Sequence, residues 1–287
     1  MSPAVVIFTY AVLTVLASLA GGWLPALIQL THIRKQLVMS LVSGVMLGVA
    51  MLHMLPQSVE HLPSVSWVGG AMLAGVLVMF FLVRVFHVHS HDHPEDHGDC
   101  LDEQHHHDHD VEHKLSWSVL LVGLTIHSLL DGVAMAASVA AEAGHDEPAM
   151  RMLGLGTFLA VFLHKPLDAL AITSLMRSAD SSDKSRTVVN VLFALSCPLG
   201  ALIFWFGAEQ VVQDHAIVVG CALAFSAGFF LCIALSDLLP EVAFHSHDRL
   251  KLSTALLIGV ALAVCIEMSH SHEPSGEQHR EHSEESP

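Results

Sequence analysis

Eight long apolar stretches dominate this chain of 287 residues. They cover residues 5–30, 37–55, 68–86, 115–141, 150–176, 187–206, 216–239 and 252–268. A helix needs about 20 residues to cross a hydrocarbon core of about 30 Å. Because lipid offers no partners to backbone polar groups, such segments are expected to be helical. The pattern predicts an all-α, polytopic membrane protein with eight transmembrane helices.

The composition argues against an ordinary soluble enzyme. Hydrophobic residues make up 53% of the chain and charged residues only 14%, against about 25% charged residues in soluble domains. The formal net charge of −16 argues against nucleic acid as a partner, whereas 28 acidic residues and 23 histidines suit cations. The five cysteines have no CxxC spacing, so neither a disulfide framework nor a thiolate zinc site is expected.

The basic residues predict the orientation in the membrane. With loops assigned alternately to the two sides, one side receives nine Lys and Arg residues and the other only Arg151 and Arg280. The positive-inside rule places the first side in the cytosol, so both termini are expected to be non-cytosolic, by default at a plasma or inner membrane. We interpret the first stretch as a span rather than a cleaved signal peptide, because no Lys or Arg precedes it.

The spans are interrupted by a histidine-rich loop and followed by a polar tail. The expected divisions are helices one to three in 1–86, the cytosolic loop in 87–114, helices four and five in 115–176, helices six to eight in 177–268 and the tail in 269–287. The loop is too polar to fold alone. It is interpreted as a device for metal capture or sensing, with a solvated linker as the alternative. Its candidate ligands are His105, His106, His107 and His109.

The motif H-x-x-L-D-x-x-A occurs in both the fourth and the fifth stretch. It contains His127 and Asp131 in the first copy and His164 and Asp168 in the second. Residues four apart share a helix face, and ionisable groups at mid-membrane need a partner or a wet cavity. Consecutive spans are antiparallel, so the four side chains can meet at one depth. Two imidazoles and two carboxylates suit Zn²⁺; the alternative is two His–Asp hydrogen bonds that only join the helices.

Lys165 lies too near the middle of its span to reach the membrane surface. It is expected to pair with an acid or to lose its proton. One hypothesis is that its ammonium group takes the place of a second cation and makes the centre mononuclear. The alternative is an ion pair without a mechanistic role. The adjacent Pro166 removes a helical donor and predicts a bend beside a pathway.

A second repeat relates two distant spans. Residues 44–61 align without a gap with residues 228–245, and helices two and seven point in opposite directions. Inverted repeats of this kind are typical of alternating-access carriers. The repeat places polar residues toward the two mouths, either on the route or as caps of helix ends: His53 and Gln57 outside, and Asp237, Glu241, His245 and His247 on the cytosolic side. Ser128 and Lys165 complete the predicted pathway at the centre.

These residues resemble the ZIP (Zrt/Irt-like) family of divalent-metal importers over nearly the whole chain. The resemblance rests on the eight spans, outward termini, the histidine-rich third loop, HSLLDG, HKPLD, and the LPQ and LPE helix ends. The pair His164 and Lys165 is most similar to the branch whose fifth helix begins with His-Lys.

The resemblance implies a three-plus-two-plus-three helix arrangement, frequent dimerisation, and movement of Zn²⁺, sometimes Fe²⁺, Mn²⁺ or Cd²⁺, into the cytosol. The family's core-metal positions correspond to His127, Asp131, His164 and Asp168. Many relatives gain a second metal through Asn and Glu where this chain has Ser128 and Lys165, so a binuclear centre is not expected. Small-residue faces in the third span also favour a homodimer. The family further suggests that helices one, four, five and six move against the other four.

The sequence thus predicts a secondary transporter, not an enzyme. Zn²⁺ would cross into the cytosol by alternating access through a mid-membrane site of two His and two Asp, driven by metal or proton gradients. One alternative is an intramembrane zinc-dependent hydrolase, with Ser128 or Glu241 assisting the chemistry. Another is a metal sensor without flux. The expected partners are the metal ion, the lipid bilayer and a second copy of the chain, without nucleic acid.

Overall fold

A computed structural model describes residues 2–27, 31–87, 109–143, 153–211, 215–244 and 249–271. This part of the chain contains helices and no strand, and eight spans in it are long and apolar enough to cross a membrane. The prediction of an all-α protein with eight spanning helices is confirmed. The elements are α1 (Pro3–Leu27), α2 (His32–Val49), the π-helical turn η1 (Ala50–Met54), α3 (Leu55–His61), α4 (Val65–His87), α5 (His109–Ala143), α6 (Leu155–Ser178), α7 (Asp183–Val211), α8 (His215–Phe244) and α9 (Arg249–Ser271).

The second span is longer than the predicted 37–55, because it continues as one apolar helix through Ile33–His61. A proline inside a helix lacks an amide donor and its ring collides with the carbonyl four residues earlier. Here Pro56 lies in the first turn of α3, immediately after the wider turn η1. The π-turn lets the helix pass the proline, and it also carries His53. Turns of this kind are frequent at functional sites.

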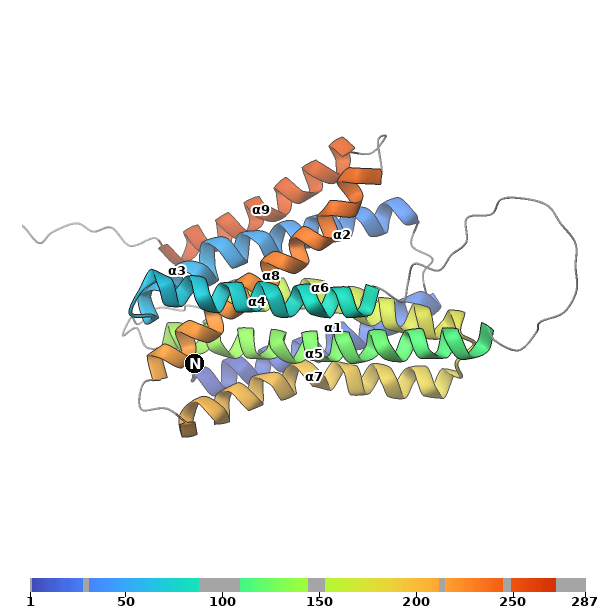
Figure 1. The fold of residues 1–287 in the computed structure, drawn as a ribbon, viewed down its shortest axis with the longest axis horizontal. Coiled ribbons are helices and arrows are strands. Elements are labelled where there is room, and N and C mark those ends of the chain that lie inside the picture. Colours follow the sequence, from blue (N-terminus) through green and yellow to red (C-terminus); the bar gives the residue numbers. More distant parts are fainter. Residues whose placement is uncertain are drawn as a thin grey trace, which may run out of the picture.

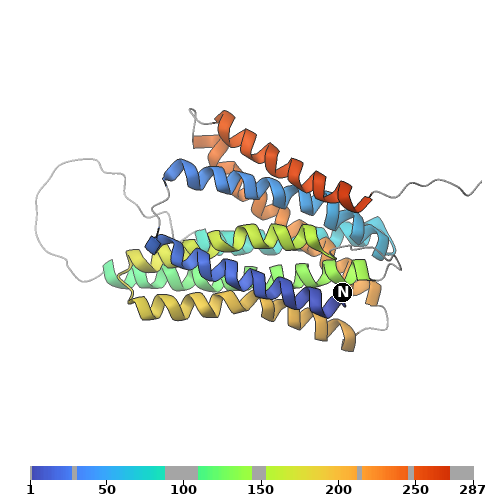
Figure 2. The ribbon, with the colours of Figure 1, turned by 180° about the vertical axis from the view of Figure 1, so that it is seen from behind.

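The helices associate in four lengthwise pairs: α2 with α9, α4 with α8, α5 with α7, and α1 with α6. Figure 1 shows α2 and α9 on one side of the bundle and α1, α5 and α7 on the other, with α8 running obliquely between them. Figure 2, from behind, shows α1 lying along α6 and α7. The antiparallel helices α5 and α6, which carry the two H-x-x-L-D motifs, lie within this bundle.

Glycines allow three of these pairs to approach backbone to backbone. Gly132 of α5 faces the carbonyl group of Cys197 on α7. In return, Gly200 of α7 faces the carbonyl group of Leu129 on α5. A Cβ atom at either glycine would overlap the facing oxygen, so any larger residue would separate the helices. The same reciprocal arrangement joins α2 to α9 through Gly44 and Gly259, and α4 to α8 through Gly75 and Gly228.

The homodimer stays a prediction. In the third span, Gly75 is used inside the chain, against the carbonyl group of Phe225. A Cβ atom at Gly69 or Gly70 would have no neighbour within 4 Å among the described residues, and both positions are exposed. Of the three glycines in this span, Gly69 and Gly70 therefore remain available to a second copy.

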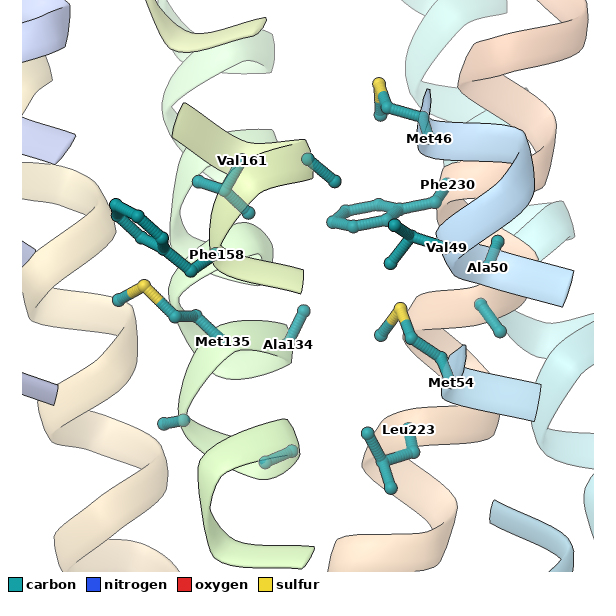
Figure 3. Packing of buried hydrophobic residues seen from close by; sticks show 14 of the residues in the cluster. Met46, Val49, Ala50, Met54, Ala134, Met135, Phe158, Val161, Leu223 and Phe230 are labelled. Carbon is teal, nitrogen blue, oxygen red and sulfur yellow. The ribbon is translucent and has the colours of Figure 1, made fainter. Parts of the chain in front are cut away.

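The main hydrophobic core lies between α5 and α6 on one side and α2, η1 and α8 on the other. Figure 3 shows Ala134, Met135, Phe158 and Val161 on the first side, and Val49, Ala50, Met54 and Phe230 on the second. All but Phe158 are at most 2% exposed. Large flexible side chains such as Met46 and Met54 face this interface from α2 and η1 (Figure 3), in contrast to the glycine contacts within the helix pairs.

Candidate metal centre

The structure brings together the four predicted ligands. His127 and Asp131 of α5 and His164 and Asp168 of α6 each offer one ligand atom, and these four atoms all lie within 4.8 Å of one another. Both pairs lie near the middle of their spans, Trp117–Ala143 and Leu155–Ser178. The i, i+4 spacing aligns each pair on one helix face, and the antiparallel arrangement brings the two faces to the same depth.

The distances between the ligand atoms match a tetrahedral ion. His127 Nε2 lies 3.4 Å from Asp131 Oδ2 and 3.5 Å from Asp168 Oδ2. His164 Nε2 lies 3.2 Å and 3.8 Å from the same two oxygens. Tetrahedral Zn²⁺ with bonds of about 2.0 to 2.1 Å separates neighbouring ligand atoms by about 3.3 to 3.4 Å. The four distances from Nε2 to Oδ2 are thus close to those expected between zinc ligands.

Neighbouring groups fix the orientation of the two imidazole rings. His164 Nδ1 donates a hydrogen bond to the carbonyl group of Ala160 over 2.7 Å, which directs Nε2 toward the cluster. Two phenylalanines of α8 hold the rings from the other side of the interface. Phe229 stacks on His127 at 5.3 Å between ring centroids, and Phe230 meets His164 edge to face at 6.2 Å. Sequence reasoning missed these aromatic contacts.

Lys165 is fully buried beside the ligands, at 1% exposure. Its Nζ donates to Asp131 Oδ2 and lies 3.5 Å from Asp168 Oδ2. The ammonium group also lies 5.7 Å from the ring centroid of Phe193, a cation–π contact. Pairing with an acid, one of the two outcomes expected of this residue, is therefore what the structure contains. The same carboxylate oxygens face both Lys165 and the imidazoles.

Several buried polar atoms of the centre have no hydrogen-bond partner within the described part of the chain. They are His127 Nδ1, Ser128 Oγ and Asp131 Oδ1. Buried polar groups in proteins are nearly always paired with protein or water. Three such atoms on consecutive turns of α5 indicate a site that is completed by water or by a ligand. Ser128, predicted on the pathway, follows His127 in α5 and has no exposed surface; its place on the pathway stays a prediction.

A second polar cluster contains His53 and Gln57, predicted for the outer mouth. His53 Nδ1 lies 2.9 Å from Glu267 Oε2 of α9, and His53 Nε2 lies 3.1 Å from Glu142 Oε1 of α5. Gln57 Nε2 donates to Glu142 Oε1 over 2.8 Å, and the amide of Gly154 donates to Glu142 Oε2 over 3.0 Å. The cluster therefore joins the second, fourth and eighth spans, and it also contacts Gly154, the residue that precedes α6. We call it the outer cluster.

Glu142 and Glu267 were not among the predicted site residues. The available signal was their position, because an acid inside an apolar span needs a partner. Glu142 lies within the span Trp117–Ala143 and Glu267 within Arg249–Met268. Their partner His53 is distant along the chain from both, so spacing within one helix could not identify the pairing.

An apolar layer separates the two polar clusters. Ala134 lies one helical turn from Asp131 and one turn from Ser138, which contacts His53 over 3.3 Å. Val161 lies one turn from His164 on α6, and Phe230 reaches the same layer from α8 (Figure 3). All three apolar residues are fully buried. These three side chains therefore place an apolar layer between the outer cluster and the centre.

The predicted cytosolic end of the route is only partly described. Asp237 and Glu241 belong to the last turns of α8, and His109 is the first residue of α5. His245 and His247 lie outside the described residues, as do His105, His106 and His107. The roles assigned to these residues stay predictions.

Comparison with known proteins gives a consistent result. A family model described as ZIP Zinc transporter matches residues 5–267. Zinc transporter ZIP9-B of Xenopus laevis is 26% identical over 231 residues, which cover 74% of this chain and 69% of that protein. Zinc transporter ZIP9 of Macaca fascicularis is 28% identical over 167 residues, covering 53% and 67%.

A further relative, Zinc transporter ZIP10 of Mus musculus, is 30% identical over 135 residues, which cover 47% of this chain and 15% of that protein. These relatives are named as transporters, so the expectation that the chain is not an enzyme is confirmed. The assignment to the His-Lys branch stays a prediction. Because the family model covers most of the sequence, the chain belongs to the ZIP zinc transporter family.

Proposed function

We propose that this protein carries Zn²⁺ across the membrane by alternating access, with His127, Asp131, His164 and Asp168 as the transient ligands. The observation that carries the proposal is the set of Nε2 to Oδ2 distances of 3.2 to 3.8 Å at mid-depth of two antiparallel spans. The two carboxylates lower the combined formal charge of Zn²⁺ and the Lys165 ammonium group from +3 to +1, in a medium that penalises bare ions. The names of the relatives support zinc as the substrate.

The ligand number favours passage over hydrolysis. A catalytic zinc has three protein ligands and keeps one position for water. Here four protein atoms are available as ligands, which leaves no open position on a tetrahedral ion. Substrate release then requires the ligands themselves to separate, and ligands on two different helices, α5 and α6, can do so.

The exposure of the ligands supports release toward the end of the molecule at which α6 ends. Asp131 has no exposed side-chain surface, whereas the Asp168 side chain, one turn nearer that end than His164, is 16% exposed. The apolar layer of Ala134, Val161 and Phe230 closes the opposite side. The positive-inside bias assigns this end to the cytosol. On this proposal the exposure of Asp168 corresponds to an inward-facing state.

The position of Lys165 supports a single transported ion. Its ammonium group lies against Asp131 and Asp168, the two carboxylates that a second divalent ion would need as ligands. On this proposal Zn²⁺ replaces the contacts between the imidazoles and the carboxylates, while the Lys165 ammonium group stays beside the two carboxylates. Two tightly held ions per chain at this centre, measured in detergent, would contradict the mononuclear site.

Uptake of radiolabelled zinc into sealed proteoliposomes tests the function. We expect Asp168→Asn to lower uptake by at least about tenfold, because the substitution removes a ligand charge while it keeps the shape. The matched control is Asp180→Asn, the same change at an exposed position just beyond α6. Uptake by Asp168→Asn equal to that of the control would contradict the ligand assignment. Zinc binding without any flux would favour the sensor.

A further inference from the structure

A polar cavity of about 400 Å³ lies where α1 and α6 end and α7 begins. It belongs to neither polar cluster described above. Its lining includes two guanidinium groups, two hydroxyls, one amide and one indole: Arg177, Arg186, Thr173, Thr187, Asn190 and Trp23. By the positive-inside bias this end faces the cytosol. Trp23 is 52% exposed, as is typical of an aromatic residue at the membrane boundary.

The cavity combines positive charge with an unsatisfied buried acceptor. Asp183 pairs with Arg186, but its side chain is 89% exposed to solvent, whereas that of Arg186 is 19% exposed. The cavity lining therefore holds two guanidinium groups, of Arg177 and Arg186, against one carboxylate that is largely exposed to solvent. Asn190 is 2% exposed and donates to the carbonyl group of Leu19 over 3.3 Å. Its Oδ1 has no partner among the described residues.

An apolar groove of about 570 Å³ continues along the same two helices, α1 and α7. Its nearest lining residues are Leu16 of α1 and Leu195 and Pro198 of α7. Pro198 follows Thr187 by 11 residues, three helical turns, so the groove and the polar cavity share one face of α7. Leu16 and Trp23, seven residues apart, share one face of α1 in the same way. The polar cavity and the apolar groove therefore lie in line along α1 and α7, and we call the two together the seam.

We propose that this seam binds an anionic phospholipid whose headgroup carries hydroxyls. The guanidinium groups of Arg177 and Arg186 match the phosphate, since arginine forms paired hydrogen bonds to phosphate oxygens. A headgroup hydroxyl is the donor that Asn190 Oδ1 lacks. One acyl chain then enters the groove between Leu16 and Leu195.

The dimensions of a single leaflet fit this placement. Half of a hydrocarbon core of about 30 Å is about 15 Å, or about ten residues of helix. A lipid with its phosphate near Asn190 therefore reaches the level of Gly200, and it covers Leu195 and Pro198 on the way. The part of the groove beyond that level belongs to the other leaflet. The inference does not require the metal centre, so its failure would leave the proposed transport function untouched.

Retention of lipid by the purified full-length chain tests this site. Native mass spectrometry after delipidation would compare dioleoyl phosphatidylglycerol with dioleoyl phosphatidylcholine, which has the same acyl chains. We expect the wild-type chain to retain phosphatidylglycerol about tenfold better. Arg177→Gln with Arg186→Gln should remove the preference. The matched control, Arg34→Gln with Lys35→Gln, deletes two exposed charges outside the cavity and should keep it.

A second variant keeps the test decisive if the double substitution harms folding. Thr187→Glu places a carboxylate at the cavity from an exposed position, and it should likewise abolish the preference by repelling phosphate. Equal retention of both lipids by the wild-type chain would overturn the proposal. So would equal loss in the Arg34 and Lys35 control.

Two other occupants are distinguished by further arms of the experiment. If glycerol 3-phosphate, which has no acyl chains, raised the thermal unfolding midpoint as much as phosphatidylglycerol does, the site would be one for a soluble anion. If Leu195→Cys formed a disulfide with a second copy of the chain in lipid, the seam would be a dimer contact. Either result would overturn the lipid assignment.

Discussion

The centre and the outer cluster use the same residue types in different arrangements. At the centre, each of two imidazole nitrogens lies 3.2 to 3.8 Å from each of two carboxylate oxygens. In the outer cluster, the His53 imidazole lies between two glutamates, with Glu142 at one ring nitrogen and Glu267 at the other. The first arrangement suits an ion, whereas the second suits the joining of helices. Histidine and carboxylate content alone therefore does not identify a metal site.

The largest effect is expected from breaking the centre. Asp131→Asn should lower zinc uptake by more than about 100-fold, because the residue is a ligand and also the fully buried partner of Lys165. It should also destabilise the protein by about 3 to 5 kcal/mol, because it leaves a buried ammonium group without its closest carboxylate. Uptake in proteoliposomes and thermal unfolding measure the two losses.

A second substitution separates these two losses. Adding Lys165→Met to Asp131→Asn removes the uncompensated charge and should restore most of the stability without restoring uptake. A double variant that regained uptake would show that Asp131 serves the lysine rather than the metal. The centre would then resemble the outer cluster, since its aspartate would join side chains rather than bind the metal.

A moderate effect is expected from weakening the outer cluster. Glu142→Gln keeps the shape but removes the charge that faces His53, so the unfolding free energy should fall by about 1 to 3 kcal/mol. Zinc binding in detergent should remain at the wild-type stoichiometry, because the cluster joins helices and supplies no ligand to the centre. Glu60→Gln, at an exposed position in α3, is the control. Loss of one bound ion in Glu142→Gln alone would reveal a metal site there.

The smallest effect is expected from the histidine-rich loop. Deletion of residues 90–112 should leave basal flux within about twofold of the full chain, because transport rests on ligands built into spans rather than on low-complexity sequence. Regulation by the cytosolic zinc level should change instead. Flux assays over a range of internal zinc concentrations measure both, and abolished flux in a correctly inserted deletion variant would contradict this view.

Much of the fold was predictable because lipid imposes length and backbone pairing on every span. The continuation of the second span beyond residue 55 was not, since a proline at position 56 normally ends a helix and only the π-turn lets it pass. Which helices pair with each other could not be predicted from the sequence either. The facing carbonyl group at each glycine belongs to a residue far away along the chain.

The central ligands could be identified because each His–Asp pair lies within one helix and repeats in the next. The outer cluster could not be assembled from spacing, since the contact between His53 and Glu267 joins residues 214 apart in sequence. The same holds for Phe229 and Phe230, which orient the imidazoles from α8. A sequence pattern shows which groups are expensive to bury, but the partners come from tertiary packing.

The reciprocal glycines have a consequence for motion. Where a carbonyl oxygen sits in the notch left by a missing side chain, sliding one helix past the other would drive that oxygen into the next residue's Cβ. The pairs α2 with α9, α4 with α8 and α5 with α7 are therefore expected to resist sliding along their axes. Slippage is expected instead along the boundary between α6 and the α2–η1 helix, where the pliable thioethers of Met46 and Met54 can reseat after a displacement.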